Sequence, residues 1–137
     1  MQCLCGRGDE ISQVPDSLRY TKEHEWVKQE SENGRIGITD HAQNELTEIV
    51  FVELPKIGKK VRKGDALGVV ESVKTVSDIY SPVSGEVIDA NKALEDSPQL
   101  INQSPYDKGW FALIKLAEPS EVSGLMDASS YKKATGD

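Results

Sequence analysis

The sequence predicts a mainly β domain whose short strands fold as two packed sheets or a flattened barrel. Short segments rich in β-branched and aromatic residues recur along the chain, and glycines, prolines and polar residues separate them, which is typical of strands joined by turns. At 137 residues, the chain is long enough to bury one hydrophobic core without metals or disulfides. It contains no internal repeat of solenoid length.

The first half of the chain contains a predicted hairpin followed by a helix. Residues 26–30 and 35–38 flank Asn33-Gly34, a dipeptide that favours tight turns between strands. Asp40 is the expected cap of a short helix that continues through Leu46, because its carboxylate can accept a free backbone amide in the first turn.

Further strands and two terminal helices complete the predicted order. Residues 51–54 alternate apolar and polar side chains as a half-buried strand does, and Pro55 ends that strand. Asp127 is the expected cap of the last helix. The remaining predicted elements are strands at residues 86–90 and 111–116 and small helices at residues 119–126 and 127–134.

A single lysine, Lys74, stands between two β-type segments in the middle of the chain. Residues 69–73 lead into it and residues 76–80 lead out, and both are rich in Val, Ile or Tyr. Gly64 and Gly85 lie at similar distances on either side and tolerate sharp bends. The pattern predicts a hairpin that presents one ammonium group to water. Exposed lysines are common, so these residues alone assign it no special role.

The hairpin resembles the lipoyl-attachment hairpin of the glycine cleavage system H-protein family, with Lys74 at the attachment position. Biotin carriers have methionines beside the lysine, and lipoyl domains of 2-oxoacid dehydrogenases usually have an acid before it. Here Val73 and Thr75 flank the lysine, which disfavours both relatives. The resemblance runs from about Val14 to about Tyr131 and includes the hairpin at 68–87 and segments 20–27, 37–43, 49–55, 93–102 and 105–110.

This resemblance implies a barrel-sandwich hybrid with a protruding lipoyl-lysine hairpin and short peripheral helices. It implies a carrier with lipoate bound through an amide on Lys74, attached by a lipoyl ligase or transferase. The arm is expected to take the aminomethyl group of glycine from a pyridoxal-phosphate decarboxylase (P-protein) to a tetrahydrofolate-dependent aminomethyltransferase (T-protein). A dihydrolipoyl dehydrogenase (L-protein) then reoxidises it. The thiol chemistry belongs to the prosthetic group, so the chain is not expected to be an enzyme.

Two acids are candidates for a cleft that shelters the aminomethyl arm. Glu25 and Asp78 match family positions near such a cleft, and an exposed charge pair of about 0–1 kcal/mol would hold a cationic amine without trapping it. Two ordinary solvated acids are the alternative. Some relatives have a histidine where this chain has Glu45, so no histidine is assigned to the cleft. His24 and His41 are expected to be structural or surface residues.

The charge of the chain limits its partners. The formal net charge of −7 argues against nucleic acid and suits a protein that docks transiently on other proteins. Residues 56–63 are an exception, a basic segment that we interpret as a solvated loop. No apolar stretch has the length of a membrane span, so we expect a soluble protein. We also expect a monomer without a metal site.

The N-terminal residues stand apart from the rest of the chain. Residues 1–13 are expected to be a flexible extension and residues 14–137 the carrier domain. Cys3 and Cys5 are too few for a zinc site and too close for an unstrained disulfide. The segment lacks the features of a secretory or mitochondrial signal, so the bacterial cytoplasm is expected, with the mitochondrial matrix as the alternative. A lipoyl carrier or relay for another pathway, and an unmodified binding module, remain alternative functions.

Overall fold

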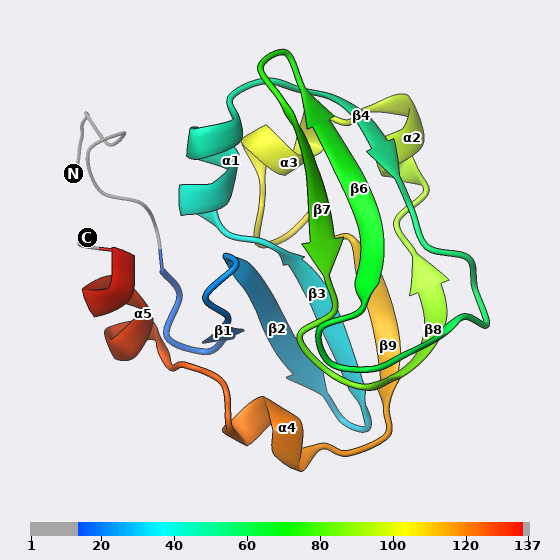
Figure 1. Cartoon of the computed structure of the whole chain (residues 1–137), viewed down its shortest axis with the longest axis vertical. Helices are drawn as coiled ribbons and strands as arrows, with labels where there is room; N and C mark the ends of the chain where they lie inside the picture. Colours follow the sequence, from blue (N-terminus) through cyan, green and yellow to red (C-terminus); the bar gives the residue numbers. More distant parts are fainter. Residues whose placement is uncertain (1–13, 136–137) are drawn as a thin grey trace.

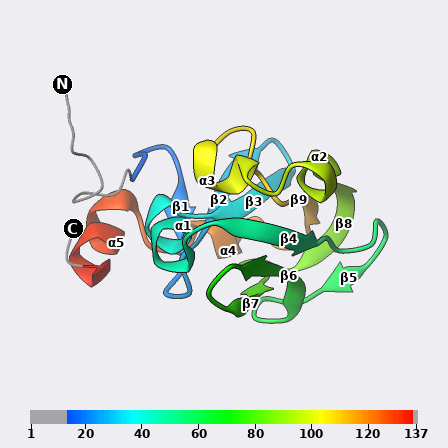
Figure 2. The ribbon, with the colours of Figure 1, turned by 90° about the horizontal axis from the view of Figure 1, so that it is seen from above.

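The computed structural model describes residues 14–135, which form two antiparallel sheets packed one over the other (Figures 1 and 2). The predicted mainly β, sandwich-like fold is confirmed, although neither sheet closes into a barrel. The smaller sheet has the order β4 (Ile49–Glu53), β6 (Ala66–Ser72) and β7 (Val76–Tyr80). The larger has the order β1 (Arg19–Tyr20), β2 (Glu25–Glu30), β3 (Asn33–Ile38), β9 (Ala112–Leu116), β8 (Gly85–Ala90) and β5 (Lys60–Val61).

The main hydrophobic core lies between the two sheets. Val27 and Ile36 of the larger sheet pack in one cluster with Val52, Val70 and Ile79 of the smaller sheet. Each of these side chains is at most 4% exposed, and burying a side chain of this size contributes about 1.5–3 kcal/mol. The buried positions are those of the β-branched residues, so the pattern of these residues in the sequence located the strands.

A second cluster attaches the C-terminal helix α5 (Ala128–Thr135) to the edge of the larger sheet. The rings of Tyr20 and Tyr131 stack with their centroids 4.7 Å apart. Trp26 is fully buried, and its indole nitrogen donates to the carbonyl oxygen of Pro105 at 3.0 Å. Aromatic pairs and satisfied indole N–H groups of this kind stabilise a buried contact beyond its area.

The β2–β3 hairpin is present, but its turn is not at the predicted Asn33-Gly34. Glu30 pairs directly with Asn33, so the two connecting residues are Ser31 and Glu32 and Asn33-Gly34 begins strand β3. Ser31, one of the two connecting residues, has a positive φ of 57°. Gly34 instead lies beside the side chains of Val27 and Leu116, where a Cβ would approach Leu116 to 3.1 Å.

Helix α1 (Asp40–Leu46) covers the residues predicted for it, but Thr39 caps it and not Asp40. The Thr39 hydroxyl accepts the backbone N–H of Ala42 at 3.2 Å, and Thr39 has the extended backbone of a cap residue. Asp40 is the first residue inside the helix. The predicted cap of the last helix is confirmed, because the Asp127 carboxylate accepts the backbone N–H of Ser130 at 2.8 Å.

The other short helices surround the sheets (Figure 1). The region predicted as helix at residues 119–126 is helical only at α4 (Ser120–Ser123). Two helices of four residues each, α2 (Ala93–Asp96) and α3 (Leu100–Gln103), were not predicted, because such short helices show no apolar periodicity. Among residues 14–135, no helix is long and apolar enough to cross a membrane. The predicted extension at residues 1–13 lies outside the described residues.

Candidate functional site

Lys74 lies in the turn between β6 and β7, at the tip of the predicted hairpin (Figure 1). The backbone N–H of Ser72 donates to the carbonyl oxygen of Thr75 at 2.8 Å. The Ser72 hydroxyl in turn accepts the backbone N–H groups of Lys74 at 3.1 Å and of Thr75 at 3.0 Å. Ser72 therefore closes the turn, a role that sequence reasoning missed because a serine beside a turn is ordinary composition.

The Lys74 side chain is exposed and its ammonium group donates to the carbonyl oxygen of Glu45 at 3.0 Å. Glu45 belongs to the last turn of helix α1, where carbonyl groups lack partners inside the helix and attract cations. A second bond joins the backbone N–H of Val73 to the carbonyl oxygen of Glu48 at 3.0 Å. The hairpin tip is thus held against the end of α1 while the amine stays accessible to an acylating enzyme.

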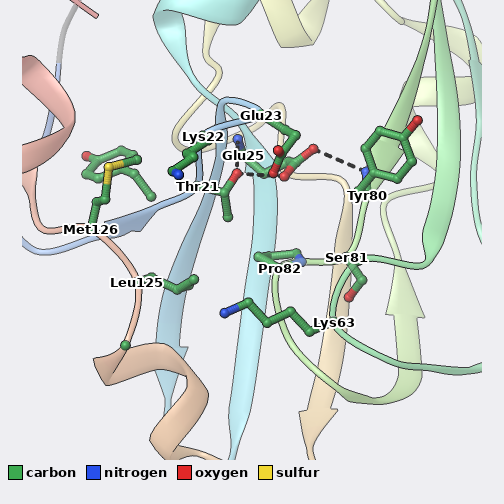
Figure 3. A pocket seen from close by; sticks show the side chains of 13 residues that line it. Thr21, Lys22, Glu23, Glu25, Lys63, Tyr80, Ser81, Pro82, Leu125 and Met126 are labelled. Carbon is green, nitrogen blue, oxygen red and sulfur yellow. Dashed lines mark hydrogen bonds between the residues drawn. The ribbon is translucent and has the colours of Figure 1, made fainter. Parts of the chain in front are cut away.

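Glu25 is buried at 2% exposure, whereas the prediction treated it as an exposed acid. One carboxylate oxygen accepts the Thr21 hydroxyl at 2.7 Å and the other accepts the backbone N–H of Tyr80 at 3.1 Å (Figure 3). Burial raises the pKa of Glu25 to about 7, and these two hydrogen bonds only partly oppose the shift. Glu25 is therefore a buried acid that titrates near neutral pH.

Glu25 and Asp78 line the same cavity of about 140 Å³, between the start of β2, helix α1 and strand β7. Asp78 is exposed, so the prediction of a solvated acid holds for Asp78 but not for Glu25. The cavity brings the two predicted acids together and also has Glu45 on its wall. Its apolar walls come from five side chains: Ile38, Ala42, Leu46, Val70 and Ile79.

Residues of strand β7, which follows the attachment turn, form one wall of this cavity. Lys74 and Asp78 are four residues apart in the chain, which is ~13 Å at the rise of ~3.3 Å per residue of a strand. A flexible group of about that length on Lys74 would reach the acids. Glu25 also borders a second cavity of about 270 Å³, whose other walls include Tyr80, Pro82 and Met126 (Figure 3).

His24 and His41 lie next to each other, with ring centroids 4.6 Å apart. The Nδ1 atom of His24 lies 2.7 Å from the Tyr131 hydroxyl, and that hydroxyl lies 2.8 Å from the Thr39 hydroxyl. These bonds link the segment before β2 and the start of α1 to helix α5, which supports the structural role expected for His24. Within residues 14–135, no cluster of His, Cys, Asp and Glu has the geometry of a metal site.

A sandwich that holds one lysine on a rigid hairpin tip, next to a small cavity with a buried acid, defines the class of swinging-arm carrier domains. The more specific assignment comes from comparison with known proteins. The family model of the glycine cleavage H-protein matches residues 18–137. The chain therefore belongs to the glycine cleavage H-protein family, which confirms the resemblance found in the sequence.

Individual relatives agree with this family assignment. The glycine cleavage system H protein of Geobacillus kaustophilus is 55% identical over 119 residues, which cover 87% of this chain and 94% of the relative. That of Staphylococcus haemolyticus is 51% identical over 124 residues, which cover 90% and 98%. The crystal structure of the Mycobacterium marinum H protein superposes with a TM-score of 0.84 at 36% identity, covering 90% of this chain and 100% of that one.

Proposed function

We propose that this chain is the lipoyl-bearing carrier of a glycine cleavage system, with lipoate bound as an amide to Lys74. The observation that carries the proposal is the position of Lys74, exposed on a closed turn in a chain of the H-protein family. The partners are the glycine decarboxylase, the aminomethyltransferase, the dihydrolipoyl dehydrogenase and the enzyme that attaches lipoate. The chain carries the aminomethyl group between the first two and is a carrier component, not an enzyme.

The residues around Lys74 fit an attached lipoate. The amine makes one exposed hydrogen bond, to the Glu45 carbonyl, so acylation requires no rearrangement of the core. The bonds of Ser72 keep the turn fixed, and the flanking strands β6 and β7 place the attachment point at the exposed tip of the hairpin. Lipoate supplies the thiol and redox chemistry when it is bound, so the chain needs no nucleophile or general base of its own.

Glu25 and Asp78 are proposed to receive the cationic cargo at the end of the arm. Both line the cavity beside β7, and each carboxylate oxygen of Glu25 keeps a lone pair after accepting one hydrogen bond. Asp78 adds an exposed carboxylate to the lining of the cavity. An acid that titrates near neutral pH and an exposed acid would bind an ammonium group moderately, as a carrier that must release its cargo requires.

The test is the intact mass of the protein after incubation with a lipoylating enzyme, lipoate and ATP. The wild type is expected to gain one lipoyl group, and peptide mapping should place it on Lys74. The Lys74→Arg variant keeps the charge but offers no acylable amine, so it should gain nothing. Lys28→Arg, an exposed lysine on β2, is the matched control and should be lipoylated as well as the wild type. A lipoyl group on Lys74→Arg would refute the proposal.

We also propose that the protein acts in a bacterial cytoplasm. The H proteins of the bacteria Geobacillus kaustophilus and Staphylococcus haemolyticus are 55% and 51% identical to this chain. Fractionation of the native host with an antibody against the chain would test the location.

A further inference from the structure

The connection from β4 to β6, which includes the two-residue strand β5 and which we call the basic loop, carries an unusual concentration of positive charge for this chain. The chain as a whole has a net charge of −7, but the segment from residue 56 to residue 63 contains five cations and no acid. All five side chains are exposed, and within residues 14–135 none of them forms an ion pair. The five are Lys56, Lys59, Lys60, Arg62 and Lys63.

The backbone of this basic loop is fixed. The N–H of Gly58 donates to the carbonyl oxygen of Val87 at 2.7 Å, and the N–H of Val87 donates to that of Lys59 at 2.8 Å. The Lys59 ammonium group also donates to the carbonyl oxygen of Ala66 at 3.1 Å, and Val61 is buried at 4% exposure. The cations are therefore presented from a defined position, which reduces the entropy lost when a partner binds.

An exposed apolar side chain stands among the cations. Ile57 is 56% exposed and borders two surface hollows, one of about 600 Å³ shared with Lys59 and one of about 360 Å³ shared with Lys92. Lys56 borders both hollows. A single exposed isoleucine is ordinary on a protein surface. The walls of the two hollows also contain acids, Glu53 and Asp78 in the larger and Glu95 in the smaller. An exposed isoleucine between two hollows, with an apolar centre and a charged rim, has the layout of an interface.

The basic loop lies at the opposite end of the hairpin from the attachment turn (Figure 1). Strand β6 runs seven residues from the loop end to the tip, which is ~20 Å at the rise of a strand. The exposed charges near the tip are acidic: Glu45, Glu48 and Glu71. A partner that receives the arm therefore meets negative charge beside Lys74 and positive charge ~20 Å away, and this polarity selects one orientation.

We infer that the Lys56–Lys63 loop docks the carrier on an acidic, partly apolar patch of an enzyme that takes up its arm. The occupant is a protein surface with carboxylates opposite Lys56 and Lys59 and an apolar contact on Ile57, ~20 Å from the opening that admits the arm. Nucleic acid is disfavoured by the overall charge of the chain. The inference rests on the proposed function, which identifies the partner enzymes. The evidence for docking is the charge and the position of the basic loop itself.

The experiment compares the affinity of the lipoylated carrier for each partner enzyme over a series of salt concentrations. The test variant is Lys56→Glu with Lys59→Glu. Lys28→Glu with Lys108→Glu, two exposed lysines outside the loop, makes the same change in net charge. We expect the loop variant to bind at least one enzyme about tenfold more weakly at low salt, with the difference shrinking as salt rises. Ile57→Ser should weaken the same complex at all salt concentrations.

Several outcomes would overturn the inference. Equal losses in the loop variant and the control variant would show a general effect of net charge. Unchanged affinity for all the enzymes, or a loss seen only as weaker retention on heparin, would reduce the loop to a non-specific cationic surface. Intact mass on the same samples reports lipoylation of Lys74 separately, so failure of the docking and failure of the proposed function can be told apart. Thermal melts establish that each variant is folded.

Discussion

The ammonium group of Lys74 lies 3.0 Å from the backbone carbonyl oxygen of Glu45, so the tip of the hairpin is tied to the end of helix α1. The bond is exposed, and a cation at a helix C-terminus contributes only about 0.3–1 kcal/mol. It holds the free lysine in one direction without burying it. Acylation of the amine removes the charge and with it most of this attraction.

The first prediction follows from this contact. Lys74→Ala should lower the free energy of unfolding by no more than about 1 kcal/mol, since it removes one exposed hydrogen bond and little buried area. Lys74→Arg keeps a donor near Glu45 and should be closer to the wild type. Urea denaturation of the three proteins measures the difference. A loss well above that size would mean that the hairpin tip contributes to the core.

The second prediction concerns the boundary of the domain. A chain that begins at Val14 should unfold cooperatively at nearly the temperature of the full chain, because the described core begins with Val14 and Leu18. Thermal melts followed by circular dichroism compare the two proteins. A broad transition in the shortened chain would place part of the core before Val14.

The third prediction is a dependence of stability on pH that comes from Glu25. Burial raises its pKa in the folded state from 4.5 to about 7, so the folded state binds more protons than the unfolded state between these values. The contribution of Glu25 to stability is therefore full below pH ~4.5, falls as the pH rises, and is lost above pH ~7. Since one pKa unit corresponds to 1.36 kcal/mol, the loss is roughly 3 kcal/mol.

Glu25→Gln should remove this dependence. The amide stays neutral, its oxygen can accept the N–H of Tyr80, and its NH₂ group can donate to the Thr21 hydroxyl. The variant should be more stable than the wild type at pH 8 and similar to it near pH 5. Denaturation curves at a series of pH values make the comparison, with Asp78→Asn, an exposed acid, as the control. Parallel curves for wild type and Glu25→Gln would contradict the assignment of the titration to Glu25.

The fourth prediction tests the two acids as a site for the cargo. Glu25→Gln with Asp78→Asn keeps the shape of both side chains and removes their charge. Lipoylation and reoxidation by the dehydrogenase should change little, since neither involves the cationic amine. The isolated loaded carrier should release formaldehyde and ammonia a few times faster, as expected for the loss of ~1 kcal/mol of pairing between the two acids and the cationic amine. An unchanged release rate would make both residues ordinary acids.

The sequence allowed the hairpin and its lysine to be located, because both arms are rich in β-branched residues and the family motif surrounds Lys74. It did not reveal that Glu25 is buried. The Glu25 carboxylate accepts the backbone N–H of Tyr80, which is 55 residues away in the chain, and such a long-range contact leaves no local pattern. The turn of the β2–β3 hairpin was misplaced because Ser31 adopts positive φ, although Asn-Gly has the stronger local preference. Contacts of β3 with Val27 and Leu116 override that preference at Gly34.

The last prediction concerns Gly85, the first residue of strand β8, which lies between β9 and β5 in the larger sheet. A Cβ at this position would clash with the carbonyl oxygen of Lys115 and would lie 2.7 Å from a side-chain carbon of Ile114. The first contact is with paired backbone that cannot move without disturbing the β8–β9 ladder. Gly85→Ala should therefore cost at least about 2 kcal/mol of stability, in the range found for overpacked cores.

Gly124→Ala is the matched control for this substitution. Gly124 has helical φ and ψ of −80° and −8°, and the nearest atom to an added Cβ is the Glu121 carbonyl oxygen at 3.6 Å. Alanine fits there, and it should stabilise the protein by about 0.4–1 kcal/mol by restricting the unfolded chain. Urea denaturation of both variants should therefore give shifts of opposite sign. If Gly85→Ala is as stable as the wild type, strands β8 and β9 do not approach each other as closely as described, and the register between these two strands is wrong.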